Sequence, residues 1–276
     1  MSVRSIKNKL MEKAVGPVDN RILGYVINNF NSVAYMNYDR LCYHAQCSSE
    51  ELDAFFRAFG TEDLLTFKSM LREVVYNESD GPDDLEDRSI RGIADMVMRY
   101  EMANIAEFSA ALDEGLISRF AQDLVSASEV YIIGMRSATS TAIYAASILN
   151  KVGVKARVID TEADYVANVV NMERTGLVLA ISYSRYHKGT INLLSHLRKN
   201  GYNIVSITDY PMSPAAKLSN YCFCCPRHSH DYTVSSLTLN MLLNIVAIHI
   251  GTQNRSDLVN RIRRYDEVTQ NLGYYF

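Results

Sequence analysis

Two different periodicities of apolar residues divide this chain. In the first part, apolar side chains recur every three or four residues with no alternating strand pattern between them, as on one face of an α-helix. The helical sets are Ile22, Val26, Ile27 and Phe30, then Leu52, Phe55, Phe56 and Phe59, then Leu64, Leu65, Phe67 and Leu71. The acidic stretch 77–87, NESDGPDDLED, has the Gly-Pro pair and the low apolar content of a linker. The pattern therefore predicts an all-helical domain over 1–76.

After the linker, short β-branched runs alternate with helical patterns. Two helices come first, with apolar positions at Ile90, Ile93, Val97, Tyr100 and Ile105, then at Leu116, Ile117, Phe120 and Leu124. Strands are then predicted at 130–133, 154–159, 177–181, 204–207 and 221–225, and helices near 138–151, 163–171, 188–199, 214–219, 233–250 and 255–270. This alternation is typical of a parallel sheet with helices on both faces. We therefore predict an α/β chain in which 77–112 form a linker and connecting helix and 113–276 form the sheet-bearing domain.

Composition narrows the class of protein. The 276 residues are 48% hydrophobic and 21% charged, an ordinary globular balance. No apolar run has the length of a membrane span, and the N-terminus is charged without an apolar signal core, so we expect a cytoplasmic protein without a membrane partner. Five cysteines form an odd set that suits free thiols in a reducing compartment. The net charge of −3 gives no overall basic field that would point to nucleic acid.

Hydroxyl and basic side chains gather after two predicted strands. Gly134, Arg136, Ser137 and Ser140 follow the run VYII, where Gly134 allows a sharp turn and the others can donate to an anion. The run 182–190, SYSRYHKGT, follows the strand LVLAI. In open parallel sheets ligands bind beyond the carboxyl ends of strands, and helix N-termini favour phosphate. The alternative for both loops is ordinary helix capping on a solvated loop.

A third cluster, Cys222 to His230, combines thiols and imidazoles. Cys222 and Cys225 have a C-x-x-C spacing with two histidines behind them, so zinc must be considered. Strand alternation, however, puts Cys222 and Cys224 on one face and Cys225 on the other, and no second ligand pair is present elsewhere. We therefore interpret the cysteines as core residues and expect no metal and no cofactor. His228 and His230 lie just past the strand, where either can reach the same ligand.

In the helical domain, residues 41–60 have the spacing of a helix-turn-helix. A short helix is followed by a turn, by Ser48 and Ser49, and by a helix that ends at Gly60. The alternative is a helical hairpin without a nucleic-acid role.

Together these parts resemble RpiR-type transcription regulators, which join an N-terminal helix-turn-helix to a C-terminal SIS (sugar isomerase) domain. The SIS domain of that family is a five-stranded parallel sheet flanked by helices, and it binds a phosphosugar. The motifs that carry the resemblance are Gly134 to Ser137, then Ser182, Ser184 and Thr190, then Thr208, Asp209, Ser213, Pro214 and Ala216, and in the N-terminal domain Leu41, Ser48, Phe55, Gly60 and Lys68. The resemblance covers nearly the whole chain.

The resemblance implies two binding sites. The effector site would consist of Gly134, Arg136, Ser137, Ser182, Ser184, Arg185, Thr190 and His228, with the three residues Ser182, Ser184 and Thr190 holding the phosphate. The DNA-binding site would consist of Ser48, Ser49, Glu51, Arg57 and Lys68. The implied partners are a phosphorylated sugar, double-stranded operator DNA and one or three further copies of the chain.

The sequence departs from the family pattern in both domains. Glu51 and Ala54 stand where the family usually has Thr and Arg, and the acidic helix would be repelled by phosphates. SIS isomerases often have Gly-Glu-Thr where this chain has Lys188-Gly189-Thr190, and isomerisation needs such a carboxylate as a base. The sequence therefore favours a regulator over an enzyme. The alternatives are a SIS-domain sugar-phosphate isomerase or lyase, and a diverged sensor that no longer binds DNA.

Overall fold

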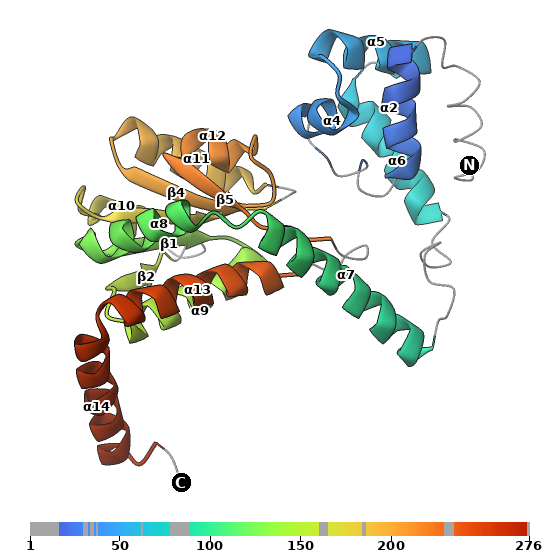
Figure 1. Ribbon diagram of the computed structural model, residues 1–276. Helices are drawn as coiled ribbons and strands as arrows, with labels where there is room; N and C mark the ends of the chain where they lie inside the picture. The colour runs from blue at the N-terminus through green and yellow to red at the C-terminus, as the bar shows by residue number, and fades with distance from the viewer. Residues whose placement is uncertain are drawn as a thin grey trace. The chain divides into compact units, whose positions relative to one another are not determined.

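The computed structural model describes residues 17–29, 33, 36, 38–61, 63–77, 89–159, 165–183, 186–228 and 235–274. The chain forms two compact units, and the boundary between them falls between Arg99 and Tyr100, inside helix α7 (Ile90–Ala110) (Figure 1). In the described part of the chain, no helix is both long enough and apolar enough to cross a membrane.

The first unit is helical, as the periodicity predicts. It contains α2 (Pro17–Asn28), α4 (Tyr38–Ala45), α5 (Ser49–Phe59) and α6 (Leu64–Asn77). Their apolar faces meet in one core, in which Leu41, Leu52, Phe56 and Phe67 are fully buried. Helices α4 and α5 and the turn between them form the predicted helix-turn-helix, and the predicted end at Gly60 is confirmed by a left-handed cap with φ of 77°.

The second unit carries a five-stranded parallel sheet between two layers of helices (Figure 1). After α7 the chain continues through α8 (Glu114–Ser126), β1 (Val130–Gly134), α9 (Ala138–Lys151), β2 (Ala156–Val158), α10 (Tyr165–Val170), β3 (Leu177–Ile181), α11 (Lys188–Lys199), β4 (Asn203–Thr208), α12 (Pro214–Leu218), β5 (Tyr221–Cys224), α13 (Leu237–Gln253) and α14 (Arg255–Asn271). The strand order is β2-β1-β3-β4-β5. This is the doubly wound order in which the chain reverses direction between β1 and β3.

Both faces of the sheet are buried, which explains why the central strands are continuous apolar runs. In β1, Val130 and Ile132 belong to the core under α8, α9 and α13, whereas Tyr131 and Ile133 belong to the core under α10, α11 and α12. The predicted parallel sheet is therefore confirmed.

Several boundaries differ from the predicted ones. Strand β2 has three residues instead of the predicted six because only Ala156–Val158 pair with β1. Strand β5 ends at Cys224, one residue early, and α13 begins at Leu237. The predicted linker lies outside the described residues, apart from Asn77 at the end of α6.

Candidate functional site

The candidate ligand site lies where β1 and β3 end. These strands are adjacent and parallel, and Gly134 pairs in register with Ile181. The loops that follow them therefore leave the same edge of the sheet side by side. Because α9 and α11 lead away to opposite faces, this is the point at which a doubly wound sheet opens a crevice for a ligand.

The loop after β1 has an unusual backbone. Gly134 is still part of β1, and a methyl group placed on it would lie 2.7 Å from the carbonyl oxygen of Ala138. The prediction that Gly134 makes the sharp turn is thus wrong: glycine is needed there because the first turn of α9 passes so close. The turn falls on Arg136, whose φ of 58° is left-handed, a conformation that costs L-residues energy and that clusters at functional sites.

Ser137 follows as the N-cap of α9, but its side chain makes no capping hydrogen bond. Thr139 and Ser140 donate their hydroxyls to the carbonyl oxygens of Gly134 and Ser137 at 3.1 Å each. The side chains of Arg136 and Ser137 are exposed. A left-handed residue followed by a right-handed one points successive amide groups toward one side, which suits an anion.

The loop after β3 leads to a second helix whose N-cap makes no side-chain bond. His187 caps α11 without a side-chain hydrogen bond, and the first turn of that helix contains Thr190, which is 2% exposed. Ser182, at 4% exposed, lies at the end of β3. Of the predicted site residues in this loop, Ser184 and Arg185 lie outside the described residues.

The two loops are in contact. A methyl group placed on Gly189 would lie 3.4 Å from Met135 Sδ, so the start of α11 lies against the loop after β1. The N-termini of α9 and α11, which are helices of 14 and 12 residues, therefore meet at one place, and neither is capped by a side chain. The aligned peptide dipoles and amide groups of both favour a negatively charged ligand.

Sequence reasoning missed a cation at the same edge. Arg227 follows β5, and its guanidinium lies 3.8 Å from the centre of the Tyr183 ring while its Nε donates to the carbonyl oxygen of Ser235 at 2.7 Å. Burial lowers the pKa of Arg227, and burial raises the pKa of Tyr183 well above its ordinary value. In the described part of the chain, the buried Tyr183 hydroxyl has no hydrogen-bond partner. An arginine just after a strand was the signal that could have identified this position.

His228 is held by the connecting helix α7. Its Nε2 lies 2.8 Å from Glu107 Oε2, and its backbone N–H donates to Asn104 Oδ1 at 2.7 Å. Asn104, which is fully buried, donates in turn to the His228 carbonyl oxygen at 2.8 Å. Ser235, beyond the loop, donates to Glu101 Oε2 at 2.8 Å. The chain after β5 thus links the ligand edge to α7.

The cysteines follow the predicted alternation. Cys225 is buried in the core under α8, α9 and α13, whereas Cys222 and Cys224 are half-buried on the other face. A hydrogen bond between their thiols lowers the pKa of Cys222 to about 7 and raises that of Cys224. Among the described residues, no three His, Cys, Asp or Glu side chains are grouped so that they could hold a metal ion.

In the helix-turn-helix, two predicted DNA-binding residues also stabilise α5. Ser48 and Glu51 form a capping box: Ser48 Oγ accepts from the Glu51 N–H at 3.2 Å, and Glu51 Oε2 accepts from the Ser48 N–H at 2.8 Å. Tyr38 Oη lies 2.6 Å from Asp53 Oδ1. Two of the three acidic side chains of α5 therefore have partners within the unit.

The remaining surface of α5 exposes Ser49, Glu50, Ala54 and Arg57, while Lys68 on α6 is half-buried. An exposed arginine and a capped helix N-terminus can both contact a phosphate. Glu50 is the acidic group left on this surface without a described partner that neutralises it, and hydrogen bonds from its own N–H and from Ser48 lower its pKa.

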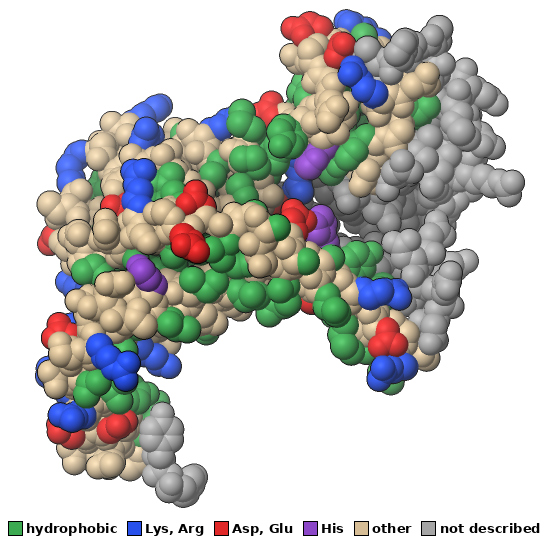
Figure 2. Space-filling view, viewed as in Figure 1, with side chains coloured by type: hydrophobic (Ala, Val, Ile, Leu, Met, Phe, Trp, Pro, Cys, Tyr) green, Lys and Arg blue, Asp and Glu red, His purple; other side chains and the backbone are tan. Residues whose placement is uncertain are grey.

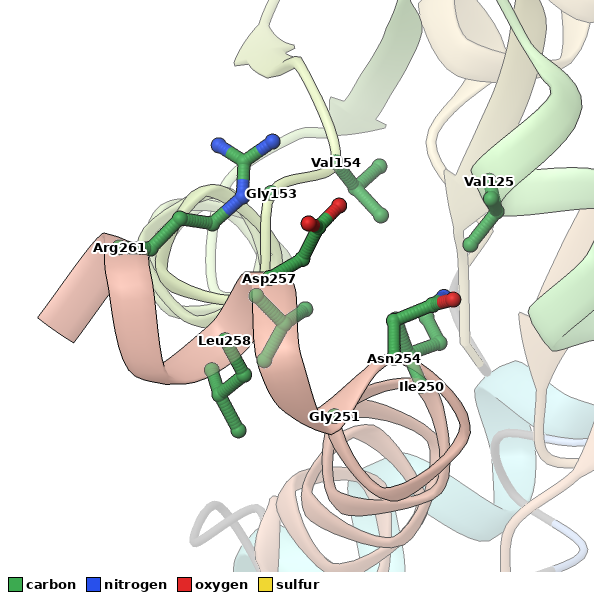
Figure 3. Close-up of a pocket in the computed structure, with 10 residues that line it drawn as sticks. Val125, Gly153, Val154, Ile250, Gly251, Asn254, Asp257, Leu258 and Arg261 are labelled. Carbon is green, nitrogen blue, oxygen red and sulfur yellow. The ribbon is translucent and has the colours of Figure 1, made fainter.

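A small cavity of about 100 Å³ lies elsewhere in the second unit (Figure 3). It is lined by the ends of α8, α9 and α13 and by the first turns of α14, including Val125, Val154, Asp257 and Arg261. Val154 precedes β2, so the cavity is at the amino edge of the sheet, opposite the loops described above. It is smaller than typical ligand pockets of about 300–1,000 Å³, and Asp257 would repel a phosphate. We therefore interpret it as a packing gap beneath the first turns of α14 and not as a ligand site.

The fold and this edge define a SIS domain. Residues 123–250 match the family model of the SIS domain. The resemblance of the chain to RpiR-type regulators is also confirmed.

Three relatives illustrate the likeness. An uncharacterised HTH-type transcriptional regulator of Caldanaerobacter subterraneus is 17% identical over 94% of both chains. The Vibrio vulnificus NanR protein, solved in complex with ManNAc-6P, is 17% identical with a TM-score of 0.71, over 96% of this chain and 99% of its own. The sugar isomerase domain of an RpiR transcription factor from Sphaerobacter thermophilus is 18% identical with a TM-score of 0.60, over 62% of this chain and 97% of its own.

Proposed function

We propose that this chain is a bacterial transcription regulator that binds a phosphorylated sugar through its SIS domain and double-stranded DNA through its helix-turn-helix. The observation that carries the proposal is the convergence of two helix N-termini, neither capped by a side chain, at the β1/β3 edge of a SIS domain in a chain that also has a helix-turn-helix. NanR, which shares this fold over nearly its whole length, is described as binding ManNAc-6P. That sugar phosphate therefore belongs in the first panel of effectors.

In the proposed complex, Ser182, Ser184 and Thr190 donate hydrogen bonds to the phosphate. The amide groups at the starts of α9 and α11 complete the phosphate site, and Arg136, Ser137 and Arg185 add donors and positive charge. Arg227 supports the site from behind Tyr183. Gly134 keeps α9 close to the ligand edge.

His228 has a different proposed role from direct sugar binding. Because its ring and backbone are held by Glu107 and Asn104, we propose that it transmits ligand binding to α7, the helix that continues into the first unit. A phosphate that pulls on Arg227 and Tyr183 would shift the neighbouring His228 and, with it, the end of α7.

We propose sensing rather than turnover. Gly189 occupies the position at which SIS isomerases often carry a glutamate, and Asp209, a carboxylate that follows β4, accepts a hydrogen bond from the Tyr186 hydroxyl at 2.8 Å. A turnover assay with hexose and pentose phosphates tests this point. Catalytic release of an isomerised or cleaved sugar would instead favour the alternative of a SIS-domain isomerase or lyase.

DNA binding is tested by fluorescence anisotropy with labelled fragments from upstream of the chain's own gene. We expect sequence-specific binding that weakens steeply with salt, because Arg57, Lys68 and other basic residues displace the counterions bound to the DNA phosphates. The affinity for DNA should also change when a sugar phosphate is added. A scrambled fragment is the control. Equal binding to both fragments at every salt concentration, with and without effectors, would contradict the proposed regulator function. It would favour a sensor that has lost the ability to bind DNA.

A further inference from the structure

The turn between α4 and α5 is a Schellman motif, a helix C-terminus closed by two backbone hydrogen bonds. The N–H of Cys47 donates to the carbonyl oxygen of Cys42 at 3.0 Å. The N–H of Gln46 donates to the carbonyl oxygen of Tyr43 at 3.2 Å, and Gln46 has a left-handed φ of 51°. These are the two bonds and the backbone conformation that define the motif. The chain from Cys42 to Cys47 therefore has a defined geometry.

The same motif brings two thiols together. In a Schellman motif, the two residues joined by the longer-range hydrogen bond frequently also have their side chains in apolar contact. Here both residues are cysteines: Cys42 and Cys47 are half-buried, and both pack against the core of the first unit. A hydrogen bond joins their thiols, and Cys42 Sγ lies 3.8 Å from the carbonyl oxygen of Ser48. The turn of the helix-turn-helix thus contains a dithiol.

The geometry of this dithiol fits a disulfide. Standard bond lengths and the 3.0 Å hydrogen bond keep the Cα atoms of Cys42 and Cys47 within about 7 Å of each other, and disulfides join Cα atoms that are roughly 4.4–6.8 Å apart. Because the thiols are already in contact, rotation of the side chains can bring the sulfur atoms to the bonding distance of about 2.05 Å. Cys222 and Cys224 are a poorer pair, since two residues along an extended strand are about 6.6 Å apart and their strand is held by pairing with β4.

We propose that Cys42 and Cys47 are a redox site, which forms a reversible disulfide across the turn of the helix-turn-helix when the chain meets a low-molecular-weight disulfide such as oxidised glutathione. One protein thiolate attacks oxidised glutathione, breaks its S–S bond and releases one glutathione thiolate, which leaves a mixed disulfide. The second protein thiolate attacks the protein sulfur of the mixed disulfide and releases the second glutathione. Two protein thiols are thereby oxidised, one glutathione disulfide is reduced to two thiols, and the two protons pass to the released glutathiones.

Burial sets the conditions of this reaction. It raises the pKa of the Cys42 thiol to about 12 and raises the pKa of Cys47 as well. Since only the thiolate attacks a disulfide, the exchange is slow at neutral pH and accelerates as the pH rises. Strongly oxidising disulfides are those whose reduced form is stabilised, and a buried thiol pair with raised pKa values lacks that stabilisation. The disulfide, once formed, is therefore stable until a reductant is supplied.

The disulfide acts at the start of α5. Cys47 precedes Ser48, the N-cap whose carbonyl oxygen accepts from the Leu52 N–H at 3.1 Å. Bonding of the two sulfur atoms removes the Cys42 S–H group beside that carbonyl and ties α4 to the first turn of α5. Figure 2 shows acidic and basic side chains on the surface over α5, at the top of the view, and a shift of α5 would move these groups. An effect on DNA affinity rests on the proposed function, whereas formation of the disulfide does not.

Mass spectrometry of the full chain tests the proposal, because trypsin cleavage after Arg40 and Arg57 leaves both cysteines in one peptide. The reduced protein is equilibrated at pH 8 with glutathione buffers of increasing oxidised fraction, and the remaining thiols are alkylated. We expect this peptide to lose two hydrogens and to escape alkylation as the oxidised fraction rises, and dithiothreitol to reverse both changes. Further cleavage after Tyr43 should leave the two halves joined through their sulfur atoms.

The matched control moves one thiol and keeps the number of thiols constant. In Cys47→Ser/Ser49→Cys, the second thiol is on the first residue of α5, outside the Schellman motif. We expect this variant to remain alkylated at the oxidised fractions that link the wild type. Circular dichroism checks its folding, and Cys47→Ala, in which Cys42 can bind one glutathione but cannot close the loop, serves if it fails to fold. A wild-type peptide that is alkylated or carries two glutathiones at every oxidised fraction would overturn the proposal, as would a shifted pair that oxidises as readily as the native one.

DNA binding is measured on the same samples by fluorescence anisotropy. We expect the affinity of the wild type for the upstream fragment to change on oxidation and to recover with dithiothreitol. The affinity of the control Cys42→Ala/Cys47→Ala should not respond to oxidised glutathione. An unchanged affinity in the fully linked wild type would overturn the effect of the disulfide on DNA binding. If the peptide is linked but neither form of the chain binds DNA, the proposed function fails and the redox site stands.

Discussion

Arg136 shows how a residue of the ligand edge differs from what its sequence context predicts. The pattern Gly-x-Arg-Ser after an apolar strand indicates a turn, and glycine is the residue expected to take a left-handed conformation. The structure gives that conformation to Arg136 and gives Gly134 a steric role instead. Which of these two residues turns is decided by how closely α9 approaches β1, and no local pattern contains that information.

At Ser182 we expect a specific loss of ligand affinity. Ser182→Ala should weaken sugar-phosphate binding by about 1–2 kcal/mol, roughly 5- to 30-fold, because it removes a hydrogen bond to a charged group. Isothermal titration calorimetry with ManNAc-6P and related sugar phosphates measures the effect. Ser128→Ala is the control, since Ser128 precedes β1 at the opposite edge of the sheet and bonds to Thr175. Equal affinities of Ser182→Ala and the wild type would remove Ser182 from the proposed site.

Cys222 should be the most reactive of the three cysteines around β5. The Cys224 thiol donates to it and lowers its pKa to about 7, whereas burial raises the pKa of Cys225 to about 12. A lowered pKa means that the nucleophilic thiolate appears already as the pH rises through neutrality. Alkylation with iodoacetamide from pH 6 to 8, mapped by mass spectrometry, should label Cys222 before Cys225. In the variant Cys224→Ala, the donor to the Cys222 thiolate is lost, so labelling should shift to higher pH; identical profiles would contradict this account.

At the scale of elements, helical and strand periodicities identified the described helices and strands. They were less accurate at ends, as β2 shows. Val154 and Ile159 are buried and β-branched, as is typical of a strand, yet they lie outside the three residues that pair with β1. Sequence alternation reports burial, whereas a strand boundary depends on a neighbour that the local sequence does not specify.

Helix α5 should bind DNA better when its unneutralised acidic residue is replaced. Glu50→Lys changes the exposed face by two charges in favour of phosphate, so we expect tighter DNA binding and a steeper dependence on salt. Fluorescence anisotropy over a salt series measures both. Glu114→Lys makes the same exchange in the first turn of α8 and should leave binding unchanged. If Glu50→Lys and Glu114→Lys behave alike, α5 does not face the DNA.

Helix α7 should lose its response to the effector when Asn104 is removed. Asn104→Ala breaks both hydrogen bonds to the His228 backbone. We expect effector affinity to change less than twofold, while the effector-induced change in DNA affinity is largely lost. Calorimetry and anisotropy measure the two quantities, and Asn171→Ala on the surface after α10 is the control. Full coupling in a folded Asn104→Ala variant would show that ligand binding reaches the first unit by another route.

At the scale of the whole molecule, the order of parts was the most predictable property. The acidic linker-like stretch and the change of periodicity separate a helical from an α/β region, and the strands come in the order that a doubly wound sheet uses. The sequence could also place the two hydroxyl-rich loops at strand ends. It could not place Arg227 against Tyr183, nor His228 against α7, because these contacts join segments far apart in the chain.

Helix α9 has one further consequence. Its N-cap is Ser137, on the ligand edge, and Ile143, which is 58% exposed, lies roughly 9 Å further along the helix. A rigid helix that tilts when a sugar phosphate occupies its N-terminus would therefore displace Ile143 at the surface as well. Effector binding would then change the surroundings of a side chain that lies outside the ligand edge.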